Sequence, residues 1–259
     1  MPALILMYHD LCEDPTAVPP EHQPYVLAPT VFRRQIAAMA ASGLPILTVT
    51  QWCAPSRPPR ALVLTFDDGH VSNYALTLPI LLEYRLKATF FVTAGTIGNG
   101  VTMDWDQIRA LHAAGMEIGS HTVTHRPPST LTDDELRYEL LESRRLLEAG
   151  LEAPVAAISS PTGFFNPRMR AIAREVGYHS LSFGRIGLVP DRGDPFSLNR
   201  VAVKHSTRQE DLEALLRFER RTLWRLRRQQ LVRSFARQTL GLNAYLRVRR
   251  LLTARGATP

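Results

Sequence analysis

Short apolar runs alternate with longer segments of helical periodicity along most of the chain. The apolar runs are rich in Val, Ile, Leu and Phe without strict alternation, which is typical of strands buried on both faces of a parallel sheet. Between them, apolar positions recur at helical spacing and predict amphipathic helices. The predicted strands cover residues 3–8, 61–66, 88–93, 116–120, 155–160, 178–183 and 200–203. The predicted helices cover residues 30–41, 74–84, 104–114, 132–149 and 167–176.

Capping signals mark several of these helix ends. Thr132 and Glu135 have the spacing of a capping box at the start of one helix, and we expect Gly150 to end it. Gly115 and Gly177 follow two other helices, where a left-handed residue is favoured. Strands that alternate with helices in this way predict an α/β fold, either a parallel barrel or an open sheet.

Polar residues follow or end several predicted strands. Asp67 and Asp68 follow one strand, His121 follows another, and Ser160 ends a third. The carboxyl ends of parallel strands, with the loops that follow them, form the active face of such folds. We therefore expect these side chains to meet at one rim of the sheet.

The composition is that of a globular protein, with 45% hydrophobic and 21% charged residues in a chain of 259. No run approaches the ~20 apolar residues of a membrane span. The N-terminal apolar run has no basic region before it and predicts a first strand, not a secretion signal. Cys12 and Cys53 have neither metal-ligand spacing nor a disulfide framework, so we expect free thiols and a cytoplasmic location.

Charge is distributed unevenly. From Arg217 to the C-terminus there are twelve arginines and one acid, so this segment has a charge of +11. The net charge of the chain is +7, so the preceding residues sum to −4. We divide the chain into a domain of residues 1–210 and an arginine-rich amphipathic helical tail of residues 211–259.

Three roles are open to this tail. It is a solvated helix packing one apolar stripe on the domain, or a basic helix on an anionic membrane surface. Nucleic acid ranks last, because the domain is acidic and shows no recognition module. The membrane alternative would place the protein at the inner face of the membrane.

Two adjacent carboxylates, Asp67 and Asp68, come directly after an apolar strand and before Gly69. Such a pair is often only a turn. Adjacent side chains cannot point the same way, however, so one carboxylate could ligate a metal while the other faces a substrate.

His121 and His125 are four residues apart, which places both imidazoles on one face if the segment is helical. Two histidines and one carboxylate are a common ligand set for a catalytic divalent ion, with positions left for water and substrate. Zinc is the expected metal, although such a set tolerates other first-row metals.

From about Leu4 to Leu216 the chain resembles the polysaccharide deacetylases, also called carbohydrate esterase family 4 or the NodB homology domain. The resemblance is carried by residues 65–69, which read Thr-Phe-Asp-Asp-Gly, and residues 120–125, which read Ser-His-Thr-Val-Thr-His. Residues 88–92, Trp105 and residues 115–120 fit the same pattern.

The resemblance implies a distorted (β/α) barrel of about seven parallel strands. It also implies that Asp68, His121 and His125 hold one divalent metal ion, and that Asp67 is the general base. The activity implied is removal of N-acetyl groups from the amino sugars of a polysaccharide or lipid-linked glycan, in cell-surface or exopolysaccharide biosynthesis. The metal would polarise the acetyl carbonyl and activate water.

The third motif of the family departs from the pattern. It usually reads Arg-x-Pro-Tyr, whereas residues 159–163 read Ser-Ser-Pro-Thr-Gly. Pro161 and Gly163 match, and the backbone N–H of Thr162 is a candidate oxyanion donor, so we assign these three residues to substrate binding. The arginine that normally orients the catalytic aspartate is absent, and Arg168 and Arg200 are the candidates to replace it.

The general acid has two candidates. His205 occupies the position of the family's last motif but matches it weakly, and His9 follows a Tyr-His strand end that some relatives use in the site. We prefer His9; its alternative is a histidine that only caps a strand. Trp105 is assigned to stacking on a sugar ring, and a core role is its alternative.

Two other functions compete with the deacetylase prediction. One is a different C–N hydrolase on the same scaffold, acting on a small or cyclic amide, which the missing arginine favours. The other is a domain that binds glycan without cleaving it. The complete set of Asp67, Asp68, His121 and His125 argues against the second.

Overall fold

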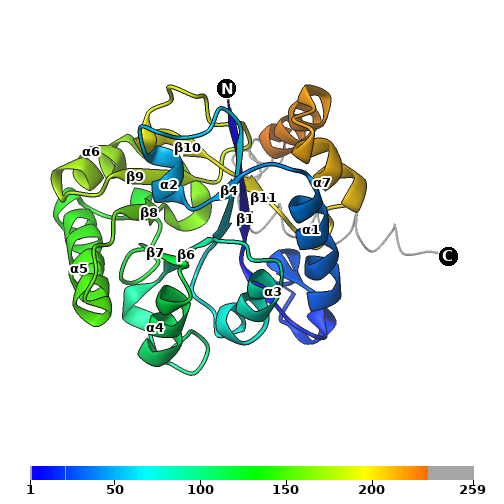
Figure 1. The fold of residues 1–259 in the computed structure, drawn as a ribbon. Coiled ribbons are helices and arrows are strands. Elements are labelled where there is room, and N and C mark those ends of the chain that lie inside the picture. Colours follow the sequence, from blue (N-terminus) through cyan, green and yellow to red (C-terminus); the bar gives the residue numbers. More distant parts are fainter. Residues whose placement is uncertain (1, 21, 233–259) are drawn as a thin grey trace. The chain divides into compact units, whose positions relative to one another are not determined.

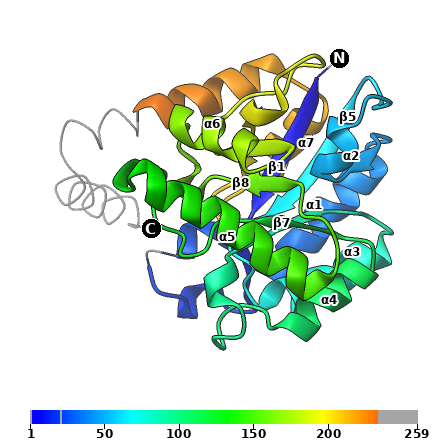
Figure 2. The ribbon, with the colours of Figure 1, turned by 90° about the vertical axis from the view of Figure 1, so that its left-hand side faces the viewer.

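The computed structural model describes residues 2–20 and 22–232. The chain forms two compact units, Met1–Phe218 and Glu219–Pro259, which are described separately. In the first unit a parallel sheet is surrounded by helices (Figures 1 and 2). The predicted α/β barrel is confirmed as a nearly closed one.

The main sheet has nine strands in the order β10-β9-β8-β7-β6-β5-β1-β11, with β4 paired to β5, and all these pairs are parallel. Each of the seven predicted strands contains an observed one. The two-residue strands β2, β3, β4 and β10 were not predicted, because they are too short to form a hydrophobic run. The bounds are β1 (Ala3–Tyr8), β2 (Asp10–Leu11), β3 (Val26–Leu27), β4 (Ile46–Leu47), β5 (Ala61–Phe66), β6 (Thr89–Val92), β7 (Glu117–Ser120), β8 (Ala157–Ser159), β9 (Ser180–Phe183), β10 (Leu198–Asn199) and β11 (Val201–Ala202).

One continuous segment joins the two ends of this sheet. β10 pairs with β9 and β11 pairs with β1, yet only Arg200 separates them in the chain. The segment therefore bridges the gap between the outermost strands, and Arg200 lies at the bridge. β1 and β5, both wholly buried, lie in register from Ala3↔Ala61 to Tyr8↔Phe66, so their carboxyl ends are level.

Within the described residues of the first unit there are seven α-helices. α5 begins with the predicted capping box of Thr132 and Glu135. The predicted helix at 74–84 begins instead as a π-helical turn, Asn73–Thr77, and continues as α3. The bounds are α1 (Pro29–Ala41), α2 (Val49–Cys53), α3 (Leu78–Glu83), α4 (Trp105–Ala113), α5 (Asp133–Leu151), α6 (Pro167–Glu175) and α7 (Gln209–Leu216).

Two of the three predicted helix-ending glycines are confirmed. Gly115 and Gly177 have φ of 78° and 86°. Gly150 is a correction: α5 continues through it to Leu151, and the C-cap residue Glu152 is left-handed with φ 54°. Glycine is required at 150 because a Cβ would lie 2.2 Å from a ring carbon of Trp105.

The first unit extends past the predicted boundary at residue 210, because α7 belongs to it and buries Leu212, Leu215 and Leu216. In the second unit, residues 220–232 are helical. The rest of the predicted tail, residues 233–259, lies outside the described residues. Among the helices that are described, none has the length and apolar character needed to cross a membrane.

Candidate metal centre and catalytic residues

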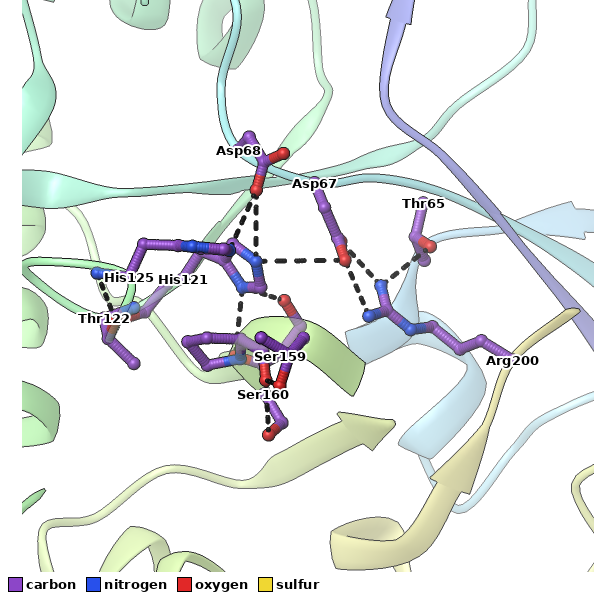
Figure 3. Close-up of polar contacts among 12 residues, drawn as sticks. Thr65, Asp67, Asp68, His121, Thr122, His125, Ser159, Ser160 and Arg200 are labelled. Carbon is purple, nitrogen blue, oxygen red and sulfur yellow. Dashed lines mark hydrogen bonds and ion pairs between the residues drawn. The ribbon is translucent and has the colours of Figure 1, made fainter. Parts of the chain in front are cut away.

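Asp67 and Asp68 follow the buried strand β5, and their carboxylates have different main partners, as Figure 3 shows. The backbone of Asp67 continues the sheet, since its N–H donates to the Tyr8 carbonyl at 3.0 Å. Asp68 and Gly69 then turn the chain with φ of 73° and 74°. Because of this turn, Asp67 faces Arg200 while Asp68 faces two histidines.

His121 and His125 follow β7 in a loop, so the helical arrangement considered for them is wrong. The loop brings them together by another route, with left-handed backbone at Thr122 (φ 66°) and His125 (φ 59°). Their ring centroids are 4.8 Å apart. The Nε2 atom of each lies 3.3 Å from Oδ1 of Asp68.

These three side chains fit a divalent metal ion. Their candidate ligand atoms all lie within 4.8 Å of one another. Oδ1 of Asp68 is buried and, although close to both imidazoles, is aligned with neither as a hydrogen bond. Nδ1 of His121 lies 2.6 Å from the Ser159 hydroxyl and 3.1 Å from the Ser159 carbonyl. Donation of the Nδ1 proton to Ser159 leaves a lone pair on Nε2, which is the atom that faces Asp68.

The Asp68 carboxylate and the neighbouring imidazoles stabilise each other's charged forms. Burial alone would raise the pKa of the Asp68 carboxyl, but His121 and His125 hold it well below its usual range. The same contact with Asp68 raises the pKa of His125, although burial opposes the shift. Asp68 is therefore ionised, and both imidazoles lie close to its Oδ1.

Asp67 is held by Arg200 in a buried two-point ion pair. Nη1 lies 2.6 Å from Oδ1 and Nη2 lies 2.7 Å from Oδ2, and neither residue is more than 3% exposed. Nη1 also donates to the Thr65 hydroxyl at 3.2 Å. Burial would raise the pKa of Asp67, but Arg200, with His121, lowers it. Asp67 is thus ionised beside the cluster of Asp68, His121 and His125, with its Oδ2 4.0 Å from Nε2 of His121.

Of the two arginines considered as replacements for the absent one, the structure brings only Arg200 to Asp67. Arg168 pairs instead with Asp133 at 2.5 Å and donates to the Leu131 carbonyl, with its side chain 42% exposed. Arg200 is fully buried at the bridge between β10 and β11.

His9 lies at the rim and His205 does not contact it. The carbonyl of His9 accepts from the Asn73 amide at 2.9 Å, and its ring packs on Tyr25 with centroids 4.6 Å apart. Its buried Nδ1 has no hydrogen-bond partner among the described residues. Burial lowers the pKa of His9, while the nearby Asp68 and Asp67 raise it. His205 is exposed, and its backbone N–H donates to the Pro24 carbonyl.

The third-motif loop adjoins His121 through Ser159. Pro161–Gly163 form a 3₁₀ turn after β8, in which Pro161 is buried, Gly163 is left-handed with φ 71°, and Thr162 is exposed and left-handed with φ 62°. Ser159 was not among the predicted site residues. Its position at the start of the motif, where the family usually has arginine, was the only sequence signal for it.

Trp105 makes its contacts elsewhere. Its ring packs against Gly150 of α5, and the Arg109 guanidinium lies 5.9 Å from its centroid. Among the described residues, no contact joins Trp105 to Asp68, His121 or His125. Trp105 is half-buried, and its stacking on a sugar ring stays a prediction.

Known proteins share both the sequence pattern and the fold. The family model described as polysaccharide deacetylase matches residues 54–181. The chain is 27% identical over 206 residues to "Putative polysaccharide deacetylase YxkH" of Bacillus subtilis, covering 77% of this chain and 70% of that protein. It is 29% identical over 131 residues to the peptidoglycan-N-acetylglucosamine deacetylase of Bacillus cereus, covering 50% and 59%.

The solved structure of the Streptococcus pyogenes deacetylase PplD in complex with acetate is also similar. Its TM-score is 0.73 at 26% identity, covering 84% of this chain and 97% of that one. Residues 54–181, which contain both motifs, match the polysaccharide deacetylase family that these motifs predicted. It spans less than two thirds of the Bacillus cereus enzyme.

Proposed function

We propose that this protein is a metal-dependent deacetylase that removes N-acetyl groups from the amino sugars of a polysaccharide or lipid-linked glycan. The observation that carries the proposal is the cluster of Asp68, His121 and His125 directly beside an ionised Asp67 held by Arg200. The deacetylase names of its relatives support the substrate class.

Asp68, His121 and His125 would hold the ion, and zinc suits two imidazoles and one carboxylate. When bound, such an ion supplies Lewis acidity that polarises the acetamide carbonyl and lowers the pKa of water. Exchange with cobalt, nickel or manganese would test the choice of zinc.

Asp67 is the proposed general base. Its carboxylate takes a proton from water as the water oxygen forms a bond to the acetyl carbon. The two-point contact with Arg200 fixes the direction of this carboxylate and keeps it ionised. The backbone N–H of Thr162, in the exposed turn, is the proposed donor to the oxyanion.

His9 is the proposed general acid. The C–N bond breaks as the imidazole donates a proton to the departing nitrogen, which gives acetate and a free amine. A lowered pKa makes the protonated imidazole a stronger acid for this step. Proximity to Asp67 and Asp68 supports His9 over the exposed His205.

The proposal is tested by measuring acetate release from chitooligosaccharides and peptidoglycan fragments, and ring opening of small cyclic amides. We expect acetate from the two glycans and no ring opening of the cyclic amides. Ring opening of the cyclic amides without acetate release from the glycans would establish the competing C–N hydrolase. Glycan binding without acetate release by the metal-loaded protein would establish a binding domain instead.

We further propose that the basic tail contacts an anionic membrane surface, with the domain on the cytoplasmic side. In the helix at residues 220–232, Trp224 is 61% exposed and Leu231 is 60% exposed, and they are seven positions apart on one face. Arg228 lies 4.6 Å from the Trp224 ring centroid, and exposed Arg220 and Arg227 lie nearby in helical register. Aromatic and aliphatic side chains flanked by arginines suit the boundary between headgroups and acyl chains.

Co-sedimentation with vesicles tests this contact. We expect binding to vesicles containing phosphatidylglycerol, weaker binding by Trp224→Ala, and little binding to phosphatidylcholine alone. Equal sedimentation with both vesicle types would refute the proposal.

A further inference from the structure

The inner face of α5 carries one buried carboxylate among apolar side chains. Glu139 is 4% exposed and lies between Leu136 and Leu140, which are fully buried. Burial of an ionised carboxylate is costly unless its oxygens are hydrogen-bonded or paired with a cation. Among the described residues no lysine or arginine forms a salt bridge with Glu139.

The loop between β7 and α5 supplies its partners. Oε2 of Glu139 accepts from the backbone N–H groups of Val123 at 2.8 Å and Thr124 at 2.9 Å. Oε1 accepts from the Thr124 hydroxyl. Consecutive N–H groups that converge on one anion form a stable binding geometry. All three donors belong to the segment that separates His121 from His125.

This loop has a backbone conformation that requires support. Thr122 and His125 are both left-handed without being glycine, at a typical cost of about 1 kcal/mol or more each. The Thr122 hydroxyl accepts from the His125 N–H at 3.2 Å, and the Val123 carbonyl accepts from the Gly95 N–H at 2.9 Å. Glu139 supplies the contacts from the α5 side.

The charge of the region points in the same direction. Asp67 is compensated by Arg200, which leaves the half-buried Asp68 and the buried Glu139 as two carboxylates around the loop with no lysine or arginine partner among the described residues. Two negative charges match one divalent cation. A neutral side chain at 139 would remove one of them and also weaken the support of the loop.

We propose that Glu139 is a positioning residue for the metal site: it fixes the 122–125 loop so that His125 faces Asp68, and its charge favours a divalent cation there. This inference rests on the proposed metal-dependent function. It concerns a residue that is neither a ligand nor in contact with the reacting atoms.

The test compares zinc affinity, by competition with a chelating dye, in wild type, Glu139→Gln and Glu142→Gln. Glu142 lies on the same helix but pairs with Arg145 at the surface, so it is a matched control. We expect Glu139→Gln to bind zinc about 10- to 100-fold more weakly and to alter the visible spectrum of the cobalt-loaded protein. Glu142→Gln should match wild type in both.

Thr124→Val is the second variant, because it removes only the hydroxyl contact and keeps the carboxylate buried. We expect Thr124→Val to lose less zinc affinity than Glu139→Gln. In Glu139→Gln we also expect faster amide exchange at Val123 and Thr124. If Glu139→Gln fails to fold, Thr124→Val decides: unchanged zinc affinity would overturn the proposal. Wild-type zinc affinity in a folded Glu139→Gln would overturn it as well. Absence of zinc binding by wild type would instead refute the proposed function.

Discussion

Arg200 and Asp67 are 133 positions apart in the chain, yet their side chains meet through two hydrogen bonds of 2.6 and 2.7 Å in the closed interior of the barrel. The family's usual arginine belongs to the third motif, which here contains Ser159 and Ser160. The segment that bridges β10 and β11 supplies the guanidinium instead. The site requires a cation with two parallel donors, and an arginine from a different segment of the chain can supply it.

Replacement of Arg200 should lower activity and move its pH dependence. We expect Arg200→Lys to lower kcat/KM about 100-fold, because lysine cannot make the two-point contact. Without Arg200, burial would raise the pKa of Asp67, so the acidic limb of the rate profile should shift to higher pH. Arg168→Lys is the control and should stay within about twofold of wild type, since Arg168 pairs with Asp133 at the surface. Identical pH–rate profiles for Arg200→Lys and Arg168→Lys would contradict the proposed role of Arg200.

Removal of metal should abolish turnover and leave the fold intact. The barrel core does not depend on the cluster, because β1 and β5 are buried independently of it. We expect dialysis against a chelator to eliminate acetate release and zinc to restore it. His125→Ala should lower zinc affinity at least about 100-fold. Persistent activity in the chelated, metal-free protein would contradict this assignment.

The kinetics of His9 and His205 variants should distinguish the two candidate general acids. We expect His9→Ala to lower kcat by about 100- to 10,000-fold with a smaller change in KM. His205→Ala should have little effect, because that side chain is exposed. The measurement is steady-state kinetics on one chitooligosaccharide, and a larger loss in His205→Ala would reverse the assignment.

Asp10 should make stability depend on pH in the metal-free protein. Burial, together with Asp68, raises the pKa of its carboxyl from 3.8 to about 7. A raised folded pKa contributes stability below about pH 4 that is lost as the pH rises to about 7. Asp10→Asn should therefore be more stable than wild type by about 1 to 3 kcal/mol at pH 8 and show no gain near pH 4. Urea unfolding at the two pH values measures this, and a gain that is equal at both would exclude the titration.

Gly150 should be intolerant of alanine despite its helical position. Alanine is favoured over glycine in a helix by about 1 kcal/mol, but its Cβ would lie 2.2 Å from the Trp105 ring. We expect Gly150→Ala to destabilise the fold by about 1 to 3 kcal/mol. Trp105→Ala in the same chain should relieve the clash, so the double variant should lose less than the sum of the single ones. Additive losses in thermal unfolding would show that the contact is not the cause.

The strands that form the interior could be predicted from the sequence. β1 and β5 match their predicted bounds because each is a continuous apolar run ended by polar residues. Local sequence signals failed at two places. Gly150 was predicted to end a helix, but glycine is required there by packing against the Trp105 ring, which is distant in the sequence. His121 and His125 have helical spacing, but they lie in a loop with left-handed residues.

The sequence by itself determined the α/β barrel, the family, and the donors Asp67, Asp68, His121 and His125, because each follows a strand whose carboxyl end must lie at the common rim. Only the tertiary structure decided which arginine holds Asp67, which histidine lies beside it, and which carboxylate supports the histidine loop. Those partners are separated along the chain and meet through barrel closure and the packing of α5. A pattern along the chain records which residue types are present, whereas contacts between distant segments depend on how the strands close in space.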